Sequence, residues 1–169
     1  LKSSEDLNQP ESKNIMAAEK ELIRMLDEKS IEISIPNKLG HERIAMACSA
    51  SFAKIVGFRP ERIEDLKTAV AEACINAMEH GNKNDPSARV VINMHYNDHI
   101  FSVSVMDQGK GMDNSNNTYE EPDIELKIQK LQTPRGLGIF LIKQLVDEVE
   151  FNQTTDEGHM MRMVFKITG

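Results

Sequence analysis

The stretch Ala71-Glu72-Ala73-Cys74-Ile75-Asn76-Ala77-Met78-Glu79-His80-Gly81 combines an apolar helical face with a regular row of polar side chains. Glu72, Asn76 and His80 are four residues apart, so on a helix they form one polar ridge. An amide oxygen can ligate a hard cation, while a carboxylate one turn away orients or deprotonates a nucleophile. Taken alone, the pattern is more typical of a solvated helix face. The apolar side of the same helix comprises Ile63, Leu66, Val70, Ala73 and Ala77.

A second stretch reads Ser104-Val105-Met106-Asp107-Gln108-Gly109-Lys110-Gly111-Met112. An apolar strand ends in Asp107, whose carboxylate can accept a hydrogen bond from an exocyclic amine. Gly109 and Gly111 allow the backbone to approach a flat ring or to take positive φ. The same residues are also typical of an ordinary turn.

A third stretch reads Thr133-Pro134-Arg135-Gly136-Leu137-Gly138-Ile139-Phe140-Leu141-Ile142. Here Gly136 and Gly138 open an apolar helix, whose unpaired N-terminal amides and dipole favour an anion. Arg135 adds a forked cation that suits phosphate oxygens. The alternative is close helix packing that requires small residues, with Arg135 simply exposed.

Around these stretches, periodicity predicts the order strand, helix, helix, hairpin, helix, hairpin. We therefore expect an α+β two-layer sandwich, with a mixed, mostly antiparallel sheet and helices on one face. The predicted strands are 31–35, 88–96, 99–106, 149–155 and 159–167, with Asn97-Asp98 as a tight turn. The predicted helices are 38–56, ending at Gly57, then 60–79, opened by Pro60, and 136–147, which is apolar nearly all round and therefore expected to be buried.

Two regions stand apart from this sandwich. Residues 1–30 are predicted to be a polar tail and a helical leader over 15–29, followed by one domain over 31–169. The polar connection 107–134, with a helix predicted around 124–131, is long enough to be a functional lid.

The composition of the chain argues against several classes of protein. The 169 residues carry a formal net charge of -7, which lacks the broad basic footprint of a nucleic-acid-binding protein. Cys48 and Cys74 form no Cys-x-x-Cys pair, so we expect buried free thiols in a cytoplasmic protein. No apolar run approaches the ~20 residues of a membrane span, and no signal peptide is visible.

Taken together, the order and spacing of the three stretches resemble the ATPase/kinase superfamily of gyrase-type, Hsp90-type, histidine-kinase and MutL-type ATP-binding domains. Residues 72–81 are similar to its asparagine-bearing box, 107–111 to its first glycine box and 135–138 to its second. Within that superfamily the chain most resembles the bacterial anti-sigma factor serine kinases, over about residues 31–167. The resemblance implies a Bergerat-type ATP-binding fold.

The resemblance also implies a role for each matching residue. Asn76 would hold the Mg²⁺ that bridges the ATP phosphates, and Glu72 would be the general base toward a serine of a partner protein. Asp107 would bind the adenine amino group, with Gly109 and Gly111 shaping the pocket. Arg135 would contact the terminal phosphate, and the amides of Gly136, Leu137 and Gly138 would cradle the phosphates. The family often has a threonine near the adenine, but residues 158–162 contain none.

The function implied by the resemblance is a switch kinase. It would hold a sigma factor inactive, phosphorylate a serine on an anti-sigma factor antagonist, and form a homodimer. One alternative is the catalytic half of a histidine sensor kinase, for which residues 15–29 are too short to be a two-helix phosphoacceptor. Another is a nucleotide-sensing module without turnover, which would not need the base Glu72.

Overall fold

The computed structural model describes residues 29–109, 135–154 and 158–167. The predicted leader over 15–29, apart from Lys29, most of the predicted lid, and Gly111 lie outside the described residues. The strands are β1 (Ser30–Pro36), β2 (Arg89–Tyr96), β3 (Ile100–Met106), β4 (Glu148–Gln153) and β5 (His159–Lys166). The helices are α2 (Glu42–Val56), α3 (Pro60–Asn76) and α5 (Arg135–Leu145), and a π-helical turn, η1 (Ala77–Gly81), follows α3.

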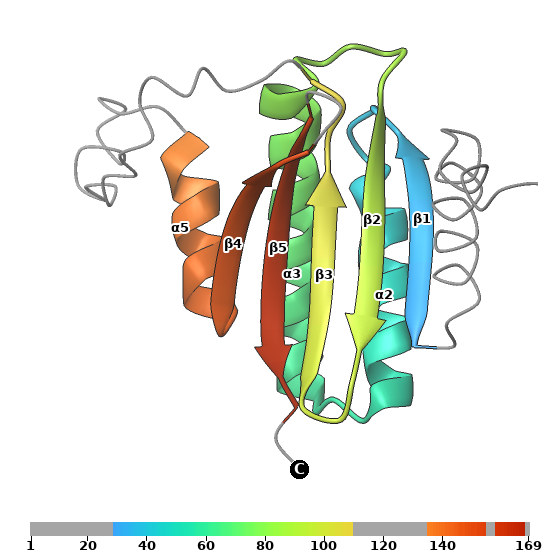
Figure 1. Cartoon of the computed structure of the whole chain (residues 1–169), viewed down its shortest axis with the longest axis vertical. Coiled ribbons are helices and arrows are strands. Elements are labelled where there is room, and N and C mark those ends of the chain that lie inside the picture. Colours follow the sequence, from blue (N-terminus) through green and yellow to red (C-terminus); the bar gives the residue numbers. More distant parts are fainter. Residues whose placement is uncertain (1–28, 110–134, 155–157, 168–169) are drawn as a thin grey trace, which may run out of the picture.

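The five strands form one sheet in the order β1-β2-β3-β5-β4 (Figure 1). Every neighbouring pair is antiparallel. The predicted element order and the mostly antiparallel sheet are therefore confirmed, but the described strands contain no parallel pair that would make the sheet mixed. The β2–β3 turn is one residue later than predicted, because Asn97 still pairs with Ile100 and its Oδ1 accepts from the amides of His99 and Ile100 at 2.9 Å.

The helices pack on one face of this sheet, as predicted, and α2 and α3 lie behind it in Figure 1. Alternate strand residues point into the layer between sheet and helices, where apolar burial stabilises the fold. Phe101 is central to this core, with Phe52 of α2 and Phe58 packing edge-on against its ring. The strand residues of the core include Ile35, Val90, Ile92, Met94, Val103, Val105, Met163 and Phe165.

Local chemistry explains where the first two helices begin and end. A turn over residues 38–41, with Gly40 at φ 97°, delays the start of α2 to Glu42, four residues after the predicted start. Gly57 ends α2 as predicted, at φ 95°, where glycine avoids the steric cost of left-handed backbone. Pro60 is the first residue of α3, also as predicted.

The third helix departs from its prediction of burial on all sides. Ile139 and Ile142 of α5 are buried, but Leu137 is 45% and Leu141 36% exposed. One face of α5 packs beside α3, so apolar content alone overestimated its burial. Among the described helices, none is long and apolar enough to cross a membrane.

Candidate nucleotide site

The polar ridge of α3 lies directly against the start of α5. A Cβ built on Gly138 would be 2.8 Å from Glu72 Oε2 and 3.3 Å from Asn76 Nδ2. Both distances are tighter than ordinary van der Waals contact, so a glycine lets the two helices approach this closely. Two of the three sequence stretches therefore meet here, and we call Glu72, Asn76 and Gly138 the carboxylate–amide cluster.

One polar atom of this cluster has no hydrogen-bond partner among the residues that the structure describes. Asn76 Nδ2 is buried and makes no hydrogen bond within the described part of the chain. An unsatisfied buried group costs about 1–3 kcal/mol, so it needs an explanation such as a ligand. Rotation of the amide by half a turn exchanges Nδ2 with Oδ1, and that oxygen is the ligand type that Mg²⁺ prefers. The cluster thus fits a magnesium–phosphate group.

The same helix end also meets the strand that carries Asp107. The Asp107 carboxylate lies so close to Gly81 that any Cβ on this glycine would overlap it. Likewise, a Cβ on Gly109 would overlap the carbonyl of Gly81. We call Gly81, Asp107, Gly109 and His159 the strand-end cluster. It joins the second stretch to the first, so all three stretches converge at the C-terminal end of α3.

Asp107 is fixed by the backbone around it. Its Oδ1 accepts hydrogen bonds from the amides of Gly109 and His159, both at 3.1 Å. Its own amide donates to the carbonyl of His159 at 3.0 Å. Only 8% of its side chain is exposed. A carboxylate held in this way is preorganised as an acceptor, which suits recognition of an exocyclic amine.

His159 lies in the stretch 158–162, where the resemblance leads one to expect a threonine and none occurs. Its Nδ1 is 3.5 Å from Asp107 Oδ1 and makes no hydrogen bond among the described residues. The residue beside the carboxylate is therefore an imidazole, and the adenine contact of a threonine cannot be transferred to this position.

Asn82 organises the strand-end cluster, and sequence reasoning missed it. The residue is only 4% exposed. Its Oδ1 accepts from the Gln108 amide at 2.8 Å, and its Nδ2 donates to Asn37 Oδ1 at 3.1 Å and to the Arg89 carbonyl at 3.0 Å. These bonds tie the Asp107 loop to the ends of β1 and β2. Its side-chain partner Asn37 and the Gln108 amide are distant in the chain, so no local pattern pointed to Asn82.

A π-helical turn links the two clusters. Over Ala77–Gly81 the helix widens, and the Asn82 amide donates to the carbonyl of Ala77 at 2.8 Å, five residues back. Such turns occur frequently at functional sites. His80 lies within this turn. His80 is half-buried and has an interaction partner.

The remaining predicted site residues are placed less completely. The side chain of Arg135, the surroundings of Gly136 and the whole of Gly111 lie outside the described residues. Leu137 is in the first turn of α5, and its side chain faces outward. Within the described ranges, no three His, Cys, Asp or Glu side chains are grouped so that they could hold a metal ion.

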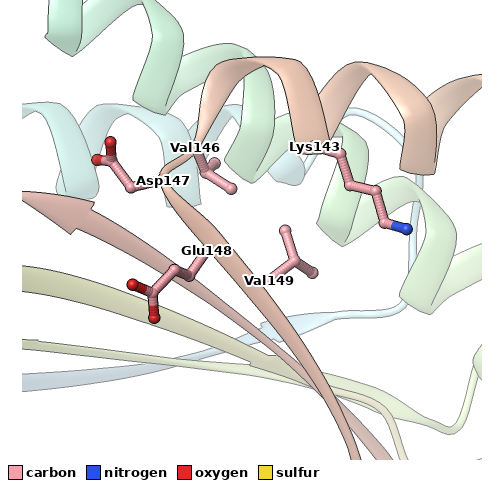
Figure 2. A pocket seen from close by; sticks show the side chains of 5 residues that line it. All are labelled: Lys143, Val146, Asp147, Glu148 and Val149. Carbon is pink, nitrogen blue, oxygen red and sulfur yellow. The ribbon is translucent and has the colours of Figure 1, made fainter.

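A separate hollow lies at the other end of α5 (Figure 2). It has a volume of about 270 Å³ and is lined by Lys143, Val146, Asp147, Glu148 and Val149. Eight residues of helix, about 12 Å, separate Val146 from Gly138. Asp147 is held there by Arg62, which also donates to the carbonyl of Leu145 at 2.8 Å. This corner is a structural anchor between α3 and α5, apart from the candidate site.

Comparison with known proteins shows the family to which the chain belongs. Residues 35–165 match the family model described as the histidine kinase-like ATPase domain. The chain belongs to this family. It is 34% identical to the serine-protein kinase RsbW of Oceanobacillus iheyensis over 125 residues, which cover 72% of this chain and 78% of that protein. It is 30% identical to the anti-sigma F factor of Anoxybacillus flavithermus, over 76% of this chain and 86% of that protein.

Structural comparison supports the fold alone. The SiaB–SiaC complex from Pseudomonas aeruginosa contains a chain that superposes with a TM-score of 0.62 at 15% identity, covering 93% of this chain and all of that one. The histidine kinase-like ATPase fold and the resemblance to anti-sigma factor kinases are thus confirmed. ATP binding follows from the family, whereas Mg²⁺, the roles of single residues and the partners belong to the proposal below.

Proposed function

We propose that this protein is an ATP- and Mg²⁺-dependent anti-sigma factor serine kinase. It holds a sigma factor inactive and phosphorylates a serine on an anti-sigma factor antagonist, as a homodimer. The single observation that carries the proposal is the convergence of the two clusters at the end of α3. The names of the relatives, a serine-protein kinase and an anti-sigma factor, support the activity and the partner class.

The two clusters suit the two ends of a purine triphosphate. The buried, backbone-held carboxylate of Asp107 would accept from the adenine amino group, and Gly109 would allow the ring to approach. About one helix turn away, Asn76 would hold Mg²⁺ and the first amides of α5, including that of Gly138, would receive the phosphates. Arg135 would neutralise the terminal phosphate. Positioning and charge neutralisation are most of what phosphoryl transfer requires.

Glu72 is the proposed general base. It would take the proton of the partner's serine hydroxyl while the serine oxygen bonds to the terminal phosphorus and ADP leaves with the electrons of the broken P–O bond. Gly138 supports this role, because it brings the phosphate-binding end of α5 to within contact of the Glu72 carboxylate.

The test is to incubate the purified chain with labelled ATP, Mg²⁺ and a candidate antagonist protein and to locate the phosphate by mass spectrometry. The proposal expects phosphoserine on the antagonist and strongly reduced transfer by Glu72→Gln. Phosphohistidine would instead support a sensor kinase. Tight ATP binding without any transfer would support a nucleotide-sensing module. The sequestering activity is tested separately by co-purification with a sigma factor in the presence of ATP or ADP. The proposal expects stronger co-purification with one of these two nucleotides.

A further inference from the structure

The outward face of α2 is apolar although it is exposed. Ile44 is 54% and Ile55 78% exposed. Cys48 and Ser51 lie between them on the same face, and the steps of four, three and four residues are those of a helix–helix seam. We call these four residues the α2 seam. No charged residue occurs between Arg43 and Lys54. Surface helices usually carry charges on their solvent face, so this face is typical of one that another segment covers.

The sequence before β1 has the matching spacing. Ile15, Ala18, Leu22 and Met25 recur at steps of three, four and three residues, with charged residues between them. As a helix, residues 15–28 would be about 21 Å long, close to the length of α2. The sequence therefore supplies an amphipathic segment of the right length for the α2 seam.

The first described residue, Lys29, lies near the C-terminal end of α2, where a helix that runs parallel to α2 would have to end. The carbonyl of Lys29 accepts from the Tyr96 amide at 3.0 Å, and the Tyr96 ring packs edge-on against Phe52 of α2 at 5.4 Å. The start of β1 and the end of α2 lie at the same end of the sheet in Figure 1, so Lys29, which directly precedes β1, is level with the C-terminal part of α2. A segment that ends there can run alongside α2, parallel to it.

We propose that residues 15–28 form a helix that docks in parallel on the α2 seam. If Lys29 is set level with Ile55, the two helices come into register. Met25, Leu22 and Ala18 lie four, seven and eleven residues before Lys29, and the three other seam residues lie at the same distances before Ile55. Each of the three layers before that level then pairs one large side chain with one small one, which favours close packing. The layers are Met25 with Ser51, Leu22 with Cys48, and Ala18 with Ile44.

A second copy of the chain fits the α2 seam less well. Two α2 helices related by a two-fold axis run antiparallel, which pairs Ile44 with Ile55 of the second copy. The same arrangement pairs Cys48 with Ser51 of the second copy. Two isoleucines therefore meet at each end of the interface, and the small side chains in its middle leave a gap. The leader avoids this defect, because every layer has one large member.

The native thiol of Cys48 makes the proposal testable in the full chain. We would introduce Leu22→Cys, oxidise with copper–phenanthroline and follow intramolecular disulfide formation by mobility and peptide mass. Lys20→Cys, on the opposite side of the same predicted helix, is the matched control, and Leu22→Cys combined with Cys48→Ser confirms the bond. Cys74 does not interfere, because burial, with Glu42 nearby, raises the pKa of its thiol to about 12.

The proposal expects Leu22→Cys to cross-link at least several-fold faster than Lys20→Cys. Equal rates would overturn it, and so would disulfide-linked dimers through Cys48, which would assign the α2 seam to a second copy. An independent measurement uses thiol labelling of Cys48. Leu22→Glu should speed labelling several-fold and Lys20→Glu should not. An unchanged rate in Leu22→Glu would mean that the leader does not cover this face.

Discussion

The two clusters at the end of α3 differ in how completely the protein satisfies them. In the strand-end cluster, Asp107 Oδ1 accepts two backbone amides and Asn82 holds the loop through three hydrogen bonds. In the carboxylate–amide cluster, Asn76 Nδ2 is buried without a partner in the described ranges. Under the proposed function, the end that would bind the adenine base is built by the fold, whereas the end that would bind the phosphates would be completed by its ligand.

The largest expected effect is on phosphoryl transfer in the carboxylate–amide cluster. Glu72→Gln keeps the shape of the side chain and removes the base, so transfer to the antagonist serine should fall by about 10²–10⁴-fold. Affinity for ATP with Mg²⁺, measured by calorimetry, should change little. A loss of ATP binding in this variant would contradict the role assigned to Glu72.

The next effect concerns close packing in the strand-end cluster. Gly109→Ala places a Cβ against the carbonyl of Gly81, which cannot move without shifting the π-helical turn. We expect a loss of about 1–3 kcal/mol in the free energy of unfolding and severe loss of ATP affinity. Gly57→Ala is the control: it is strained by its φ of 95° but has open space around it, so stability should fall while ATP affinity is retained. Equal ATP affinity in both variants would argue against Gly109 as part of the site.

A pair of asparagine variants sharpens the contrast between the clusters. Asn82→Ala leaves the Gln108 amide and Asn37 Oδ1 without partners, so unfolding in denaturant should show a loss of about 1–3 kcal/mol. Asn76→Ala removes an unsatisfied group, so stability should not fall, but the gain in ATP affinity on adding Mg²⁺ should disappear. If both variants lost stability equally, the two clusters would not differ as described.

The smallest expected effect lies outside both clusters. Arg62→Ala removes the contacts to the Leu145 carbonyl and Asp147 that anchor the far end of α5. Because Arg62 is partly exposed, we expect about 1 kcal/mol of destabilisation, measured by thermal unfolding. ATP affinity should stay unchanged, and a clear decrease would show that the α5–β4 corner is coupled to the site.

Sequence patterns predicted the elements well where the signal is local. Gly57 and Pro60 fixed two helix boundaries, and alternation fixed the strands, because these depend on the backbone preferences of neighbouring residues. The convergence of the three stretches came from the resemblance, since spacing alone left each one ambiguous. The π-helical turn, the Asn82 network and the exposed side of α5 were missed, because each depends on partners distant in the sequence.

The central claim is that the three stretches form one site for a purine triphosphate and its metal. The most direct test is a titration of the isotope-labelled chain with ATP and Mg²⁺, following the backbone amide signals of Gly81, Gly109 and Gly138 by NMR. We predict that all three signals shift with one common dissociation constant. Shifts confined to one stretch, or different constants for the three glycines, would contradict the claim.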